Sequence, residues 1–169
     1  MLKPIVNVAD VSLDSTSPEW AVATGHSAED FAAKTGVIGT RIGARKLGYN
    51  ITAVPPGKRA APFHNHPAKE EMFFVLQGSG EVRIGEARYA IHTGDIIACP
   101  AGGKGTAHQI INTGTEELRY LAVSTEHCLE MAQYPDSGRF AVGAEVGTAP
   151  DGTPQRIIFI GHENQQFNF

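Results

Sequence analysis

Short apolar runs separated by turn residues recur along most of the chain. The runs span roughly four to seven residues and recur at intervals of roughly eight to twelve, which is typical of an antiparallel β-sandwich or barrel. They lie at 49–54, 71–76, 81–84, 87–91, 96–99, 106–111, 117–123, 139–146 and 155–161. No segment of helical period competes with the runs between 49 and 123. The pattern predicts an all-β fold built from many short strands.

The first part of the chain has a different pattern, with many polar residues and few apolar runs. Ser27 is a suitable N-cap, so we expect one or two helical turns over 27–34, followed by a short strand over 37–41. We therefore expect residues 1–48 to form a mostly irregular N-terminal extension packed on a barrel, and residues 49–169 to form that barrel with additional C-terminal strands.

Composition and charge narrow the class of protein. The 169 residues are 41% hydrophobic and 19% charged, which suits one packed core. The 19 Gly and 10 Pro agree with many turns. A formal net charge of −4 implies no basic face, so neither nucleic acid nor an anionic membrane is an expected partner. No apolar run approaches the roughly 20 residues of a membrane span or forms a signal peptide, and we expect a cytoplasmic protein.

Candidate metal ligands stand out among the seven histidines. His64 and His66 are two positions apart, so in an extended segment both side chains point to the same side. After a turn, Glu70 or Glu71 opens the next strand and can supply a carboxylate oxygen. His108 follows much later, on the strand after a glycine-rich loop. Three imidazoles and one carboxylate form a mixed nitrogen and oxygen site that suits Zn, Mn, Fe, Ni or Cu.

Two segments resemble the paired motifs of the cupin superfamily. The first, GKRAAPFHNHPAKEEMFFVLQG, spans 57–78, and the second, GDIIACPAGGKGTAHQIIN, spans 94–112. The resemblance implies the cupin double-stranded β-helix, a jelly-roll barrel. It also implies a divalent metal cofactor. The ligand positions of the family fall on His64, His66, Glu71 and His108, because the six-residue spacing to the glycine that ends the first motif selects Glu71 over Glu70.

Strand parity suggests which side chains surround that site. If Glu71 and His108 face inward, so do Phe73 and Ile110, either as barrel core or as substrate contacts. Tyr49 or Ile51 also faces inward, but no ligand fixes the parity of their strand.

The second motif contains an insertion. Five residues separate Gly102 from His108 where the family has two, which lengthens a loop near the barrel mouth. Within that loop Lys104 is either a solvated lysine or a contact for a phosphate or carboxylate group.

Two classes of function fit this sequence. The first is a metal-dependent enzyme that acts on a sugar, sugar phosphate or hydroxy-carbonyl, with isomerisation as the leading reaction and iron-dependent dioxygen insertion as another. The segments QIINTGTEELRYLAVST and YPDSGR resemble small bacterial cupins grouped with sugar-phosphate isomerases. The second is a cupin that binds a sugar or organic acid without turnover. We expect a homodimer, because Met72 and Phe74 point outward by parity.

Overall fold

Strands dominate the structure, a computed structural model that describes residues 3–148 and 154–165. The first sheet has the order β1-β2-β3-β9-β4-β7, the second β6-β5-β8 and the third β10-β11-β12. The first sheet consists of β1 (Asp14–Ser15), β2 (Lys34–Val37), β3 (Leu47–Val54), β9 (Leu118–Thr125), β4 (Glu71–Gln77) and β7 (Ile96–Cys99). The second consists of β6 (Ala87–His92), β5 (Ser79–Ile84) and β8 (His108–Ile111), and the third of β10 (Leu129–Tyr134), β11 (Arg139–Thr148) and β12 (Pro154–His162).

The helices within the described residues are short. The α-helix α1 spans Glu19–Ala23, and 3₁₀ turns span Val8–Asp10, Ala28–Asp30, Gly39–Ile42, Lys104–Thr106 and Glu163–Gln165. None of the described helices has the length and apolar character needed to cross a membrane.

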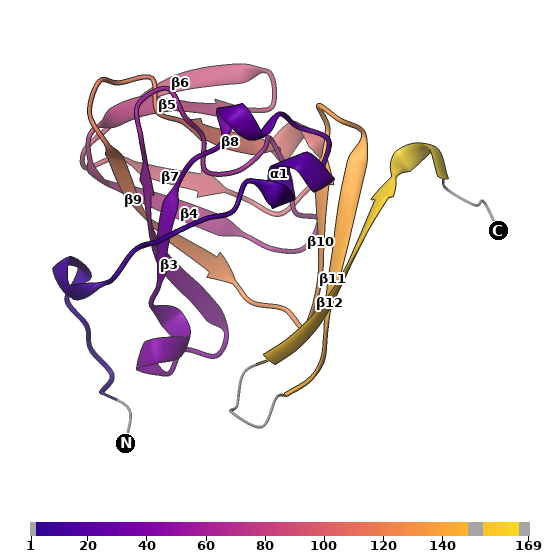
Figure 1. Cartoon of the computed structure of the whole chain (residues 1–169), viewed down its shortest axis with the longest axis horizontal. Helices are drawn as coiled ribbons and strands as arrows, with labels where there is room; N and C mark the ends of the chain where they lie inside the picture. The colour runs from indigo at the N-terminus through magenta and orange to yellow at the C-terminus, as the bar shows by residue number, and fades with distance from the viewer. Residues whose placement is uncertain (1–2, 149–153, 166–169) are drawn as a thin grey trace.

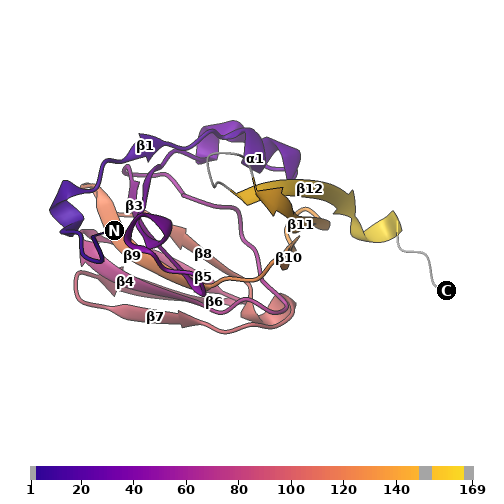
Figure 2. The ribbon, with the colours of Figure 1, turned by 90° about the horizontal axis from the view of Figure 1, so that it is seen from below.

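One core lies between the first two sheets (Figures 1 and 2). The first sheet contributes the fully buried Val54, Val75 and Leu118, and the second contributes Val82 and Ile110. Alternate residues of each strand face this core, as expected for strands with one buried face. The predicted all-β fold is confirmed, and its two facing sheets agree with a double-stranded β-helix.

The N-terminal part differs from the expectation in two places. A single 3₁₀ turn, Ala28–Asp30, replaces the helix over 27–34, and the Ser27 side chain makes no capping hydrogen bond. The strand expected over 37–41 lies earlier, at Lys34–Val37, where it pairs with β3 and widens the first sheet. Phe31 forms an isolated bridge with Arg59, and Ala32 N donates to Arg59 O at 3.3 Å, so pairing with a distant segment overrides the local helix signal. A domain division at residue 48 stays a prediction.

The third sheet stands at one end of the barrel (Figure 1). Its first strand, β10, was not expected from the sequence, whereas β11 and β12 were. Asn65 connects this sheet to the barrel, because its backbone N–H and C=O both pair with Gln133, at 3.0 and 2.9 Å. On the opposite side of the same segment, His64 pairs in the same way with His108. The segment that carries His64 and His66 thus lies between two strands.

Met72 and Phe74 are half-buried on β4, a strand with neighbours on both sides. A homodimer through this face stays a prediction, which light scattering on the purified protein can test.

The Asn112 side chain fixes the turn after β8, and its loss should be costly. Asn112 is fully buried, its Nδ2 donates to the carbonyls of Val54 and Glu116 at 2.8 Å each, and its Oδ1 accepts from Gly114 N at 3.0 Å. An Asn112→Ala variant leaves one buried and two partly buried backbone groups without this partner, so we expect the free energy of unfolding to fall by about 3 kcal/mol. Urea denaturation measures the change, and the exposed neighbour Thr113→Ala, expected within about 0.5 kcal/mol of the parent, is the control.

Candidate metal centre

His64 and His66 reach the same side of their segment because the residue between them points away. Asn65 is fully buried, and its Nδ2 donates to Gly102 O at 2.8 Å and to Gln133 Oε1 at 2.9 Å. These contacts hold the segment extended, so residues at i and i+2 share a face. The two imidazole rings lie with centroids 4.9 Å apart.

The carboxylate of Glu71 is the point on which the three imidazoles converge. Its Oε2 lies 3.0 Å from His108 Nε2, 3.4 Å from His66 Nε2 and 3.8 Å from His64 Nε2. The ligand atoms of His64, His66 and Glu71 all lie within 4.8 Å of one another, an arrangement that can hold a metal ion. His108 is not a member of that group of three, but it contacts the group through its Nε2, which lies beside Glu71 Oε2.

The charge states of these groups suit a ligand set. Burial raises the pKa of Glu71, but hydrogen bonds from His108 and His66 outweigh this and hold it well below its usual range. Burial, with the nearby His108 and His66, lowers the pKa of His64 to about 3. Glu71 is therefore ionised and His64 neutral at neutral pH, which are the forms that bind metals.

His66 is the exception, because in the metal-free protein both of its ring nitrogens carry a proton and the imidazole is positively charged. Burial lowers its pKa, but pairing with Glu130 and Glu71 outweighs burial and raises the pKa to about 9. A metal ion must displace that proton to bind Nε2.

Groups behind the imidazoles hold two of the rings in place. The Nδ1 of His64 lies 2.7 Å from Pro62 O, so Nδ1 carries the hydrogen and the Nε2 lone pair faces Glu71. The Nδ1 of His66 lies 2.9 Å from Glu130 Oε1. The Nδ1 of His108 is buried, with no hydrogen-bond partner among the described residues. Outer partners of this kind orient a metal-ligating histidine and fix its tautomer.

The residues around this cluster match a known domain. The sequence profile of the cupin domain matches residues 50–124, which include all four candidate ligands. The chain contains a cupin domain. The match begins within β3 and ends within β9, so it covers the barrel and leaves out α1 and the third sheet.

Comparisons with individual proteins extend this picture. The oxalate-binding protein of Thermotoga maritima is 31% identical over 70 residues, which are 41% of this chain and 54% of that protein. The chain thus matches about half the length of this curated relative.

Two solved structures resemble nearly the whole cupin chain. A sugar phosphate isomerase from a cupin superfamily, from Silicibacter pomeroyi, has a TM-score of 0.73 at 19% identity, covering 96% of this chain and 94% of that chain. A protein of Acidithiobacillus ferrooxidans, described provisionally as a sugar phosphate isomerase, has a TM-score of 0.71 at 21% identity, covering 92% of each chain. At these identities the likeness concerns the fold.

Two cavities adjoin the cluster. The barrel cavity, of about 220 Å³, lies inside the cupin barrel, and the sheet cavity, of about 310 Å³, lies between the cluster and the third sheet. Residues that line the barrel cavity include Asn50, Thr52, Phe73, Gln109, Ile110 and Tyr120. Residues that line the sheet cavity include Trp20, Glu130, Tyr134, Glu145, Arg156 and Ile158. His64 and Glu71 line both, so the cluster is reached from two sides.

Two of the four expected lining residues line a cavity, and the other two line neither. Phe73 and Ile110 line the barrel cavity. Tyr49 lines neither of these two cavities, because β3 directs Asn50 and Thr52 inward. Lys104 also lines neither of them, and its Nζ instead pairs with Glu163 at 2.8 Å.

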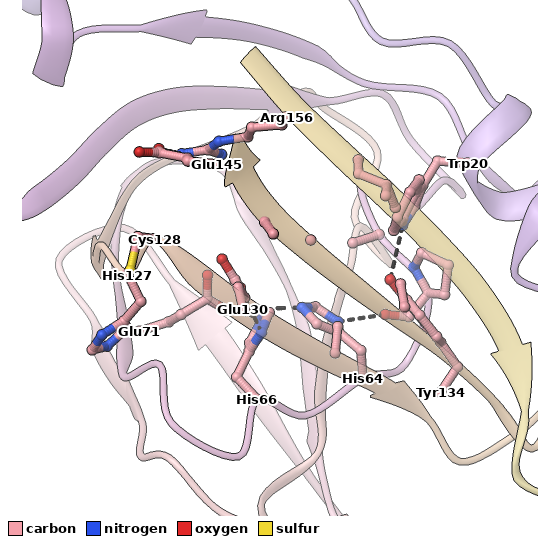
Figure 3. Close-up of a pocket in the computed structure, with 17 residues that line it drawn as sticks. Trp20, His64, His66, Glu71, His127, Cys128, Glu130, Tyr134, Glu145 and Arg156 are labelled. Carbon is pink, nitrogen blue, oxygen red and sulfur yellow. Dashed lines mark hydrogen bonds and ion pairs between the residues drawn. The ribbon is translucent and has the colours of Figure 1, made fainter. Parts of the chain in front are cut away.

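Sequence reasoning missed the residues of the third sheet that face the cluster. Glu130, Ala132 and Tyr134 of β10 all line the sheet cavity, and Figure 3 shows Glu130 beside His66. The alternation of these three residues in LEMAQY was the available signal, but one short strand of mixed composition is a weak pattern. Trp20 and Arg156 carried no signal, because only the fold brings them together.

Proposed function

We propose that this cupin binds a divalent metal ion through His64, His66, Glu71 and His108 and acts as an enzyme on a small polar substrate. Isomerisation of a hydroxy-carbonyl such as a sugar is the reaction that fits best. The convergence of three imidazoles on Glu71, beside two cavities, is the observation that carries the proposal. The ion would polarise a carbonyl or hydroxyl oxygen of the substrate.

The chain's own residues would bind and orient the substrate and exchange protons with it. Isomerisation needs a proton acceptor, and Glu130 supplies a carboxylate in the wall of the sheet cavity. Burial raises the pKa of Glu130, but hydrogen bonds from His66 and Lys69 outweigh it and leave the pKa below its usual value. Glu130 is therefore ionised at neutral pH and able to accept a proton. The third sheet forms the wall of the sheet cavity across from the cluster.

A second candidate is binding of a small organic acid without turnover. The curated relative named as an oxalate-binding protein favours it, because the two chains share 31% identity over the matched region. In that case the same ligand set would orient the acid and stabilise the barrel.

Metal analysis of the purified protein, followed by an activity panel of hydroxy-carbonyls and sugar phosphates, tests the enzyme proposal. We expect bound metal and turnover of at least one compound. A folded protein that takes up no metal would refute the proposal, whereas bound metal with tight binding and no turnover would favour the second candidate.

A separate experiment tests whether His108 is a metal ligand. We expect His108→Ala to lower the metal content of the purified protein, because it removes an imidazole 3.0 Å from Glu71. Full metal content in this variant would show that His108 is not a ligand.

A further inference from the structure

The sheet cavity differs from the barrel cavity in where its walls come from. Apart from five residues of the matched range 50–124, its lining comes from α1, the segment before β10 and the third sheet. It is also the larger of the two cavities. A ligand in the sheet cavity would therefore contact the metal cluster on one side and parts of this chain outside the matched domain on the other.

Small residues and one aromatic pair shape this cavity. Ala132, Ala141 and Gly143 line it and leave it open. Trp20 and Tyr134 form an aromatic wall, with ring centroids 6.3 Å apart and the indole Nε1 donating to the Tyr134 hydroxyl at 2.9 Å. The dashed line between Trp20 and Tyr134 in Figure 3 marks this hydrogen bond. An aromatic wall of this kind packs well against the C–H groups of a ring.

Glu130 presents a carboxylate to the cavity beside the cluster. One of its oxygens lies 2.9 Å from His66 Nδ1, and the other lies 2.7 Å from Lys69 Nζ. The Lys69 charge is therefore already compensated. An ionised carboxylate accepts several hydrogen bonds, so Glu130 retains capacity to accept one from a ligand hydroxyl.

Arg156 is held in the same way at another part of the wall. Its Nη2 lies 2.8 Å from Glu145 Oε1 and 3.4 Å from Glu126 Oε2. The lining of the cavity thus includes three carboxylates, from Glu71, Glu130 and Glu145, and one guanidinium, from Arg156, besides its imidazoles. Apart from a metal ion, the wall therefore gives an anionic ligand little net attraction, whereas its carboxylates suit a ligand that donates hydrogen bonds.

We propose that the sheet cavity is the ligand chamber of this cupin and that it takes an uncharged polyhydroxylated ring, such as a monosaccharide, in preference to a small dianion. The ring lies against Trp20, its hydroxyls donate to Glu130 and Glu145, and one of its oxygens faces the cluster of His64, His66 and Glu71. The proposal rests on the proposed metal function and names the cavity and ligand class through which that function operates.

Trp20 is the single tryptophan of the chain, and it lines the sheet cavity but not the barrel cavity. Its fluorescence therefore reports on the sheet cavity. Metal-loaded protein would be titrated with D-fructose and D-mannose, and separately with oxalate and the phosphate monoester of fructose. Calorimetry on the same samples would measure binding at either cavity. We expect a saturable fluorescence change with the neutral sugars and tighter binding of these than of oxalate or the phosphate ester.

Two cavity-filling variants separate the cavities. Gly143 lies opposite both Glu130 and Ile158 in the third sheet, and a Cβ there meets only Ile158 within 4 Å, at 3.9 Å. Gly143→Leu should therefore fill the sheet cavity without a backbone clash. Ala122→Leu is the matched variant for the barrel cavity, which Ala122 lines. We expect Gly143→Leu to weaken sugar binding by about tenfold or more and Ala122→Leu to leave it unchanged.

The metal content of each variant makes the outcomes distinct. A parent protein without metal would refute the proposed function. Metal-loaded protein in which Ala122→Leu abolishes binding and Gly143→Leu does not would overturn the chamber proposal alone. Tighter binding of oxalate or of the phosphate ester, or no binding of either sugar, would also overturn it. If thermal unfolding shows that Gly143→Leu is not folded, Ala132→Val replaces it, because Ala132 lines the same cavity and lies opposite the lining residue Ala141.

Discussion

Replacing Glu71 with alanine should severely weaken metal binding. The variant removes the one carboxylate on which His64, His66 and His108 converge, and with it the negative charge at that point. Losing an oxygen ligand and its charge should lower the affinity for a divalent ion on the order of a hundredfold, which is about 3 kcal/mol. Competition against a chromophoric chelator at fixed pH measures the affinity directly.

The neighbouring glutamate provides a matched control for that experiment. Glu70 precedes Glu71 in the chain but is exposed, and its backbone N–H donates to Thr125 Oγ1 at 3.0 Å. We expect Glu70→Ala to retain the affinity of the parent protein. If both variants lose affinity equally, or if Glu71→Ala keeps it, Glu71 is not the oxygen ligand.

The strands between 47 and 125 could be predicted from sequence because each is short, apolar and closed by turn residues. The predicted run 96–99 coincides with β7, and 49–54 falls within β3. Such strands bury one face against a single core, so local alternation and global packing favour the same structure.

The inward face of β3 could not be predicted, because its parity depends on register with distant strands. Asn50 lies opposite Ala122, and Ala122 in turn lies opposite Phe73. Directly paired residues share a face of the sheet, so Asn50 faces inward with Phe73. Tyr49 consequently lies on the other face, with Met72. Because β3 carries no candidate metal ligand, the sequence alone does not show which set of alternate residues on this strand faces inward.

Glu130 illustrates a different limit. It lies far from His66 in sequence, and the two meet only because Asn65 pairs with Gln133 across an isolated bridge. No periodic signal encodes such a bridge. The candidate ligands could be predicted from motif spacing, whereas their supporting residues required the fold.

The affinity for a divalent ion should rise steeply with pH up to about pH 9. His66 has a pKa of about 9 in the metal-free protein, so below that pH a metal ion competes with a proton for Nε2. The affinity of the protein for the metal ion should therefore fall about tenfold for each pH unit below 9, and so about a hundredfold by pH 7. His64, with a pKa of about 3, releases no proton across this range. Calorimetry in buffers of different ionisation enthalpy counts the protons released.

The same proton stabilises the metal-free protein over a different pH window. Because the pKa of His66 is raised on folding from 6.5 to about 9, its contribution is fully present below pH 6.5 and is lost as pH rises through 9. The lowered pKa of Glu71 acts in the opposite sense, since its contribution is present above the usual pKa of a glutamate and is lost in acid. Urea denaturation of the metal-free protein should therefore show a loss of stability at both extremes.

A Glu130→Gln variant tests the cause of this pH dependence. Glutamine keeps an acceptor for His66 Nδ1 but removes the negative charge that lies 2.9 Å from it. The pKa of His66 should then fall, and the pH above which metal affinity levels off should move downward with it. Glu145→Gln, on the same cavity but paired with Arg156, should leave that pH in place. If metal affinity levels off at the same pH in the parent protein and in both variants, Glu130 does not set the protonation of His66.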